Sequence, residues 1–264
     1  MYNEVYFYSY EVNMLELKQW HDEKNFFYRE FKLYFSQCNV NQDIKLAELL
    51  AITSDSAVED YHQRGLTFEL LKENKIAILT SRIAFRFHKM PKCNEIVTLK
   101  CWEEAPKGLQ LTRTYELTNE AGEVLINGFS TWLLVNLENR RIMKPSTFTL
   151  REEPTFTTPL KTLDCGKIQI PENLELLAER KICFSDLDAN GHMNNSRYAT
   201  FIIDSLPSEF QNRELADLRL NYAHEAMLGD NLELFGNLNA GENRVVVVGK
   251  QNGNVCFESE LFYK

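Results

Sequence analysis

Apolar and polar residues alternate along much of this chain, and a period of two residues predicts strands with one buried face. The alternation first becomes clear from Phe27 onward. Further strand-like stretches in the first half are Lys75–Phe87, Ile96–Trp102, Leu109–Leu117 and Val124–Leu137. Those in the second half are Lys181–Phe184, Leu218–Ala223, Asn231–Gly236, Arg244–Gly249 and Val255–Tyr263. The spacing therefore predicts two successive groups of strands.

Each group contains one stretch whose apolar residues lie three and four positions apart, which predicts a helix packed against the strands. In the first group this stretch runs from Leu46 to Ala57. In the second it covers residues 194–206, and Pro207 ends it because proline cannot continue a helix. A shorter amphipathic helix is predicted over Val12–Lys24, within an N-terminal segment rich in Tyr and Phe.

Three short segments recur in the same order in the two halves. The pairs are Phe35-Ser36 with Phe184-Ser185, Arg82–Phe85 with Arg219–Tyr222, and Gly122–Val124 with Gly253–Val255. Chance similarity between short strands is the alternative, but three matches in one order favour an internal duplication. Each copy is then an antiparallel sheet around one helix. We expect the two sheets to join edge to edge, because free edge strands promote aggregation.

The stretch before the second helix concentrates acidic, amide and imidazole side chains. Asp188, Asn190 and His192 lie two residues apart, so an extended backbone would point all three side chains the same way. Gly191 permits a turn, and the following Asn194 or Asn195 can cap the helix. Such clusters are also common in ordinary loops that end in a helix cap. The residues alone leave both readings open.

The first copy differs at the corresponding positions. Phe35 and Phe184 are 149 positions apart. At the same offset, Asn39, Asn41 and Asp43 of the first copy correspond to Asp188, Asn190 and His192 of the second. The first copy thus lacks the imidazole and has an amide in place of the first acid. We therefore expect it to be catalytically silent and to complete the sheet and the pocket.

Composition and charge narrow the classes of function. The chain has 264 residues and a formal net charge of −9, which argues against sequence-independent binding to nucleic acid. The six cysteines lack metal-ligand spacing, so we expect reduced thiols and no metal. No apolar run is long enough for a transmembrane helix. The N-terminus lacks the features of a signal peptide, and we expect a cytoplasmic location.

The order Asp-Leu-Asp-x-Asn-x-His-x-Asn-Asn-x-x-Tyr, complete here from Asp186 to Tyr198, resembles the signature of the acyl-ACP thioesterases of plants and bacteria. A second stretch, Gly122–Arg141, is similar to the family pattern Gly-Glu…Trp-x-x-x-Asn…Arg-Arg. The resemblance covers about residues 28–264. It implies an α+β fold of two tandem hotdog domains, each an antiparallel sheet wrapped around a central helix.

The resemblance also implies an activity and a partner. The activity is hydrolysis of acyl-ACP thioesters to free fatty acid and ACP in fatty acid biosynthesis, without a cofactor. The partner is the acyl carrier protein, and a homodimer is left open. The alternatives are an acyl-CoA thioesterase and a hotdog protein that binds acyl thioesters without cleaving them. A local basic patch should dock the acidic carrier, and Arg140, Arg141 and Lys144 are the best candidates.

One more acid is expected from the family pattern, in which a Tyr is followed three residues later by a catalytic Glu. Tyr222 and Glu225 fit this spacing, although most glutamates at strand ends are simply solvated. Plant members carry a Cys directly after this Glu, whereas here the position is Ala226. The implied catalytic set is Asp188, Asn190, His192 and Glu225. Glu225 would act as the base on water with His192 assisting, and the reverse assignment stays open.

These observations predict four segments. Residues 1–27 form an N-terminal extension, and 28–145 form the N-terminal hotdog, which is catalytically silent. Residues 146–177, with three prolines and weak periodicity, form the linker. Residues 178–264 form the C-terminal hotdog, which carries the catalytic residues.

Overall fold

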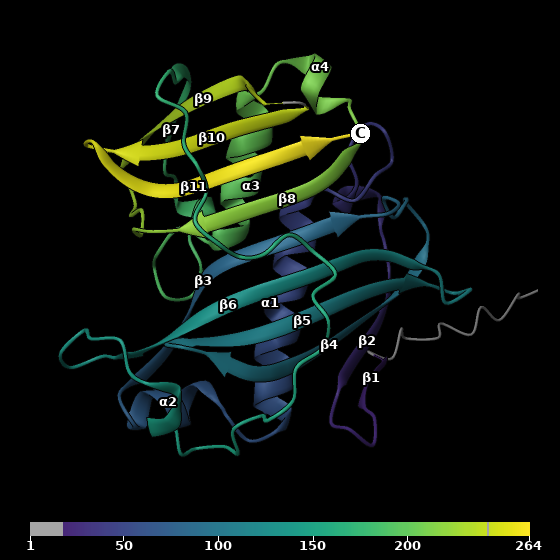
Figure 1. Cartoon of the computed structure of the whole chain (residues 1–264), viewed down its shortest axis with the longest axis vertical. Coiled ribbons are helices and arrows are strands. Elements are labelled where there is room, and N and C mark those ends of the chain that lie inside the picture. Colours follow the sequence, from purple (N-terminus) through teal and green to yellow (C-terminus); the bar gives the residue numbers. More distant parts are fainter. Residues whose placement is uncertain (1–17, 242) are drawn as a thin grey trace, which may run out of the picture.

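A computed structural model describes residues 18–241 and 243–264, and its strands form one antiparallel sheet (Figure 1). The strands are β1 (Lys18–His21), β2 (Phe27–Lys32), β3 (Ile76–Phe87), β4 (Ile96–Lys107), β5 (Gln110–Asn119), β6 (Val124–Asn136), β7 (Glu175–Lys181), β8 (Leu215–Tyr222), β9 (Asn231–Gly241), β10 (Arg244–Gln251) and β11 (Asn254–Tyr263). Their order in the sheet is β1-β2-β4-β5-β6-β3-β8-β11-β10-β9-β7.

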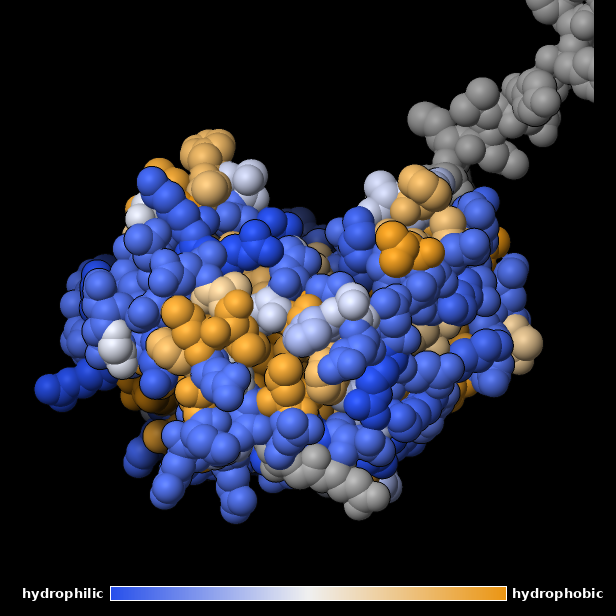
Figure 2. All heavy atoms as spheres, turned by 90° about the horizontal axis from the view of Figure 1, so that it is seen from above, coloured by the Kyte–Doolittle hydropathy of each residue, from blue (hydrophilic) through white to orange (hydrophobic). Residues whose placement is uncertain are grey.

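Two long helices lie on one face of this sheet (Figure 1). They are α1 (Leu46–Gln63) and α3 (Asn195–Ser205), the two helices predicted from apolar spacing. The short elements are α2 (Phe68–Glu73), α4 (Ser208–Gln211) and the 3₁₀ turns η1 (Phe35–Gln37), η2 (Pro145–Thr147) and η3 (Phe184–Asp186). One apolar core runs under both halves and includes Phe27, Leu49, Phe85, Ile202 and Phe257. Seen from above, the surface is mostly hydrophilic, with a hydrophobic patch near the centre of that face (Figure 2).

The two halves are joined where β3 pairs with β8. Arg82 lies opposite Asn221 and Ala84 lies opposite Arg219, so the register is symmetric about the pair Ile83 and Leu220. The strand order then reads β2-β4-β5-β6-β3 on one side and β8-β11-β10-β9-β7 on the other. This arrangement confirms the expected edge-to-edge joining and the two hotdog units. It also buries, at the centre of the sheet, two edges that would otherwise be free.

The N-terminal segment differs from its prediction where it is described. Lys18–His21 form β1, which pairs with β2, and therefore do not belong to the helix predicted over Val12–Lys24. Stacking of Trp20 on Tyr28, with ring centroids 5.1 Å apart, holds this strand to the sheet. The Tyr- and Phe-rich stretch before Leu17, and the first part of the predicted helix, lie outside the described residues.

The stretch between the two halves runs across the outer face of the sheet (Figure 1). Residues 148–174 contain no helix or strand. Side chains of the central strands hold them, because Arg82 donates to the carbonyl of Cys165 and Arg219 to that of Asp164. Strand β7 begins at Glu175, inside the expected linker, and ends at Lys181. The strand predicted over 181–184 was therefore wrong, since η3 follows instead.

Candidate active site

The polar stretch before α3 is a tight turn. Leu187 and Met193 form an antiparallel bridge, and the Asp188 amide donates to the His192 carbonyl at 2.9 Å. Gly191 has a φ of 79°, a left-handed conformation that glycine adopts without strain. The extended arm predicted for this stretch was wrong, because the local hydrogen bonds fold it back on itself. Asp188 and His192 consequently lie on opposite strands of one small hairpin.

Asp186 holds this turn to the helix that follows. Its carboxylate is 5% exposed and accepts from the Cys183 amide and from Nε of Arg197, both at 2.9 Å. Asn194 is the N-cap of α3, and its side-chain oxygen accepts from the Ser196 amide at 2.8 Å. The signature residues Asp186 and Asn194 are thus structural. They fix the turn against the amino end of α3 and leave the residues between them for chemistry.

The structure brings His192 and Glu225 together. Nδ1 of His192 lies 3.4 Å from Oε1 of Glu225, and the two side chains are 35% and 55% exposed. The Met193 amide donates to the carbonyl of Ala226 at 2.9 Å, so the backbone next to each partner is fixed. Hydrogen bonds between catalytic groups are often long without substrate. The pair is therefore placed for proton transfer on an accessible ligand.

Asp188 and Asn190 take different places. Oδ1 of Asp188 accepts from the Asn190 amide at 2.8 Å, so this carboxylate already closes the turn. The side chain of Asn190 is exposed and has no hydrogen-bond partner among the described residues. Within the described residues, neither side chain forms a hydrogen bond or ion pair with the imidazole of His192. Asn190 is free to meet a ligand, whereas Asp188 acts on the shape of the turn.

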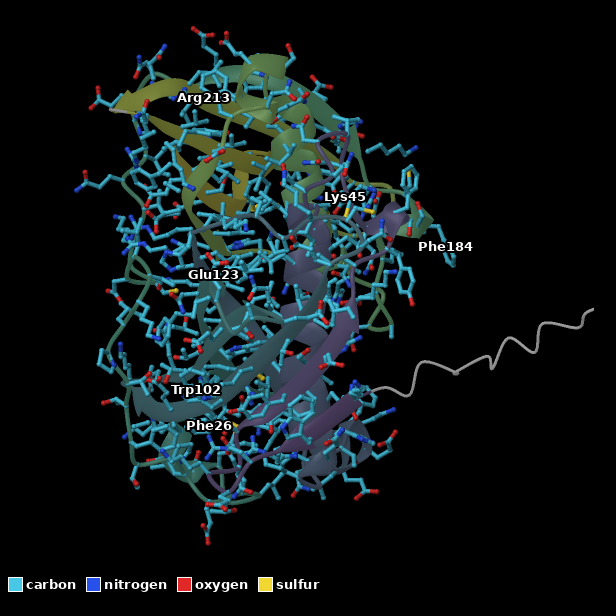
Figure 3. The ribbon with its side chains drawn as sticks, turned by 90° about the vertical axis from the view of Figure 1, so that its right-hand side faces the viewer. Phe26, Lys45, Trp102, Glu123, Phe184 and Arg213 are labelled. Carbon is cyan, nitrogen blue, oxygen red and sulfur yellow. The ribbon has the colours of Figure 1, made fainter. Side chains whose placement is uncertain are left out.

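Buried groups behind the site do not supply a nucleophile. Burial raises the pKa of the Tyr198 and Tyr222 hydroxyls, which keeps both neutral. Burial also raises the pKa of the Cys256 thiol, and Cys183 is exposed. Figure 3 shows the neighbouring Phe184 pointing away from the body of the molecule. Position 226, next to Glu225, is a buried alanine.

The first copy repeats the same turn with other side chains. Oδ1 of Asn39 accepts from the Asn41 amide at 2.9 Å, and the Asn39 amide donates to the carbonyl of Asp43 at 2.8 Å. The residue with positive φ here is Gln42, at 64°. Nζ of Lys92 lies 2.5 Å from Oδ1 of Asp43. Where the second copy has a histidine, the first therefore has a neutralised carboxylate.

Sequence reasoning missed the counterpart of Glu225. In the first copy the Ile44 amide donates to the Pro91 carbonyl, just as the Met193 amide donates to the Ala226 carbonyl in the second. Met90, the residue before Pro91, therefore corresponds to Glu225, the residue before Ala226. The first copy thus lacks both members of the pair. The sequence could have shown this correspondence. Met90 and Glu225 are 135 positions apart, and this offset falls between 137 for Arg82 with Arg219 and 131 for Gly122 with Gly253.

Two further findings concern the described residues only. They contain no group of three His, Cys, Asp or Glu side chains placed to hold a metal ion. None of their helices is long and apolar enough to cross a membrane.

Comparison with known families gives two adjacent matches. The acyl-ACP thioesterase N-terminal domain matches residues 24–146, and the acyl-ACP thioesterase C-terminal domain matches residues 173–256. A palmitoyl-acyl carrier protein thioesterase of Gossypium hirsutum, named chloroplastic, is 26% identical over 217 residues, which are 75% of this chain and 52% of that protein. The chain spans about half the length of the plant relatives it matches.

Solved structures share the fold. An acyl-ACP thioesterase from Bacteroides thetaiotaomicron superposes with a TM-score of 0.82 at 23% identity, covering 92% of this chain and 99% of that one. The 12:0-ACP thioesterase from Umbellularia californica gives a TM-score of 0.80 at 18% identity, covering 91% and 97%. These likenesses establish the tandem hotdog arrangement.

Proposed function

Since this chain belongs to the acyl-ACP thioesterase family, we propose that it hydrolyses acyl-ACP to a free fatty acid and the carrier in fatty acid biosynthesis. The observation that carries the proposal is the contact of His192 with Glu225 beside the amino end of α3. A base, an acid and oriented backbone amides are the groups that thioester hydrolysis requires. The first copy keeps the backbone of this site without its two side chains.

In the proposed reaction, water attacks the thioester carbonyl carbon and Glu225 accepts the proton that the water loses. The carbonyl oxygen becomes an oxyanion, which the amino end of α3 and the Asn190 side chain stabilise. The carbon–sulfur bond then breaks, and the carrier's thiolate leaves. His192 supplies the proton that this sulfur takes up. In the reverse assignment, His192 is the base and Glu225 orients it.

Asp188 supports this chemistry through the backbone. Its carboxylate holds the Asn190 amide, and its own amide holds the carbonyl of His192. Removing the carboxylate would loosen the turn that presents both side chains. We therefore assign Asp188 as a positioning residue and Asn190, His192 and Glu225 as the residues that meet the substrate.

The remaining expectations belong to the same proposal. The division at residues 28–145, 146–177 and 178–264 is supported by the two family matches and by the sheet's two halves. A cytoplasmic location rests on the six free cysteines, and the plant relatives are named chloroplastic. A homodimer would double the mass found by sedimentation equilibrium, and a monomeric mass would rule it out.

The experiment is hydrolysis of matched acyl-ACP and acyl-CoA series by the purified chain, from eight to eighteen carbons. The proposal predicts a higher kcat/KM for acyl-ACP at every chain length that is cleaved. Equal or better cleavage of acyl-CoA would instead make the protein an acyl-CoA thioesterase. Tight binding of acyl-ACP without cleavage would make it a non-catalytic acyl-thioester-binding protein.

A further inference from the structure

A cavity of about 620 Å³ lies beside the turn of the first copy. The cavity lies where the first copy corresponds to the site of the second. Asp43 and Met90, the counterparts of His192 and Glu225, line it, as does Asn39, the counterpart of Asp188. The volume of the cavity lies within the range of pockets that hold small molecules, about 300–1,000 Å³. The copy that lacks the catalytic side chains has therefore kept a space large enough for a ligand.

Apolar side chains from both copies form one wall of this cavity. The first copy contributes Ile44 and Leu46, and the second contributes Ala199, Ile203, Phe210 and Leu215. Most of them are nearly buried and belong to the edge of the main apolar core. An aliphatic chain lying along this wall would be removed from water, which favours binding.

Three cations at the cavity have no carboxylate partner among the described residues: Lys45, Lys89 and Arg213. Nζ of Lys45 donates to the carbonyl of Ser36 at 2.7 Å, and Nη2 of Arg213 donates to Oδ1 of Asn243 at 2.8 Å. Lys45 directly precedes α1 and Arg213 follows α4, so the cations come from both copies. Figure 3 shows Lys45 and Arg213 well apart, so they line different ends of the cavity. Such a local excess of cations stands out in a chain of net charge −9.

Three of the four acidic side chains of the wall form ion pairs. These are Asp43 with Lys92, Asp204 with Arg180, and Glu214 with Lys264. Glu48 keeps its negative charge, because its partner Gln37 is neutral. The three unpaired cations outnumber it, so the cavity is positive. An anionic group would complete their interactions.

A buried hydroxyl lies beside Arg213. Tyr263 lines the cavity, and the guanidinium carbon of Arg213 lies 5.0 Å from the centroid of the Tyr263 ring. Tyr263 is 4% exposed, and its hydroxyl has no hydrogen-bond partner within the described part of the chain.

We propose that this cavity binds a long-chain fatty acid without processing it. The tail lies along the apolar wall, and the carboxylate lies at the end of the cavity that Lys89 and Arg213 line. Lys264 connects their neighbours there, because it donates to the His88 carbonyl and pairs with Glu214. The proposal builds on the proposed function, because that reaction releases a fatty acid. With Met90 and the Asp43–Lys92 ion pair in place of the catalytic pair, a bound chain meets no base.

Equilibrium dialysis with radiolabelled dodecanoate tests this proposal, because it measures binding without any hydrolysis. Wild-type protein should bind dodecanoate more tightly than uncharged dodecanol. The double substitution Lys89→Glu and Arg213→Glu should weaken dodecanoate binding at one class of site about tenfold and leave dodecanol binding unchanged. Lys24→Glu with Lys72→Glu is the matched control, since it makes the same change in charge at exposed positions away from the cavity.

A second variant guards against a misfolded double mutant. Thr200 lines the cavity on α3, and Thr200→Trp should fill the space and reduce the binding of both dodecanoate and dodecanol. Circular dichroism and hydrolysis of a small uncharged thioester report whether each variant is folded. Hydrolysis that persists while dodecanoate binding is lost supports the second site. No hydrolysis by the wild type would instead contradict the proposed function, whatever the dialysis shows.

Two outcomes would overturn the proposal. One is unchanged dodecanoate binding in both Lys89→Glu/Arg213→Glu and Thr200→Trp. The other is unchanged dodecanoate binding together with a raised KM for acyl-ACP in the charge-reversed variant, which would make the rim of the cavity a docking surface for the acidic carrier.

Discussion

The two copies share one backbone and differ in what it carries. Each has a 3₁₀ turn, a small hairpin closed by an Asx side chain, and a helix that starts at the same distance from the turn. At the two positions where the second copy has His192 and Glu225, the first has Asp43 and Met90. The backbone geometry of the turn therefore does not depend on these two side chains.

The helices of the copies differ as well. α1 has 18 residues and α3 has 11, so α1 extends into a region of the first half that has no counterpart in the second. Its last turns carry Asp60, which is 2% exposed and pairs with Arg113 at 2.7 Å and with Arg64 at 2.8 Å. The second copy also holds a buried ion network, because Glu260 is 1% exposed and pairs with Arg219 and Arg244. Its His192–Glu225 pair, in contrast, lies near the surface.

The largest effect is expected from removing the catalytic pair. His192→Ala and Glu225→Ala should each lower kcat for acyl-ACP by about 10²–10⁴-fold, because each removes a positioned acid or base. Asp43→Ala, at the matching place in the first copy, should change kcat less than about threefold. Rates are measured under saturating substrate, with thermal melting as the check on folding. A loss in Asp43→Ala as deep as in His192→Ala would show that both copies take part in catalysis.

The next effect concerns stability and its dependence on pH. Burial alone would raise the pKa of Asp60, but Arg113 and Arg64 outweigh it and hold the pKa of that carboxyl below its usual range. Asp60→Asn leaves Arg113 buried without its counter-ion and should lower the free energy of unfolding by about 3–5 kcal/mol at pH 7. The exposed ion pair of Asp204 with Arg180 is the control, and Asp204→Asn should cost less than about 1 kcal/mol.

The sign of the pH effect follows from the lowered pKa. The charged Asp60 stabilises the fold above the unfolded-state pKa of about 4, and this contribution is lost as pH falls through the lower pKa of the folded state. Urea unfolding of wild type and Asp60→Asn should therefore give a difference that shrinks below about pH 4. A difference that stays constant down to pH 2 would mean that the carboxylate does not supply the stability.

A smaller effect is expected at the predicted docking patch. Arg140, Arg141 and Lys144 are exposed and have no ion-pair partner in the described residues. Arg140→Glu with Arg141→Glu should raise KM for acyl-ACP several-fold, and the defect should shrink with salt, because screening at about 0.15 M acts over about 8 Å. Hydrolysis of a small uncharged thioester should not change. Equal losses on both substrates would assign the two arginines a structural role.

The smallest effect compares the two turns. Gly191 has a φ of 79° and open space at its Cβ position, so Gly191→Ala should cost about 1 kcal/mol through backbone strain alone. Gln42 occupies the same place in the first copy with a φ of 64°, and Gln42→Gly should be neutral or stabilise by up to about 1 kcal/mol. Thermal melting of both variants checks the pair. Destabilisation by Gln42→Gly of more than 1 kcal/mol would show that the Gln42 side chain holds its turn.

Local patterns in the sequence predicted most of the fold. The apolar spacing gave both long helices. The alternation gave nine of the eleven strands, with ends within about five residues of those in the structure. β1 and β7 were missed because neither shows a clear period of two. β1 has only four residues, and the apolar residues of β7, Leu176 to Ala178, follow one another directly. Both strands lie at the outer edges of the sheet. The hairpin at Asp188–His192 was missed because its bonds are short-range backbone contacts that an alternating side-chain pattern does not reveal.

Local sequence patterns also predicted part of the site, namely which residues form it but not how they meet. His192 and Glu225 were found through a family signature, and their contact arises only when β8 returns beside the turn. Met90 was not recognised as the counterpart of Glu225, because the connections of the two copies differ in length and the offset changes along the chain. The cavity depends on side chains from α1, α3, α4 and the C-terminal end of β11, which no local pattern brings together.

The central claim is that one copy carries the chemistry through two side chains. The most direct test replaces both by the residues of the first copy, His192→Asp with Glu225→Met, and measures kcat/KM for dodecanoyl-ACP beside the wild type. We predict a loss of at least about 10²-fold with an unchanged melting temperature, since the first copy shows that this backbone accommodates Asp and Met. Turnover within tenfold of wild type by the folded variant would contradict the account.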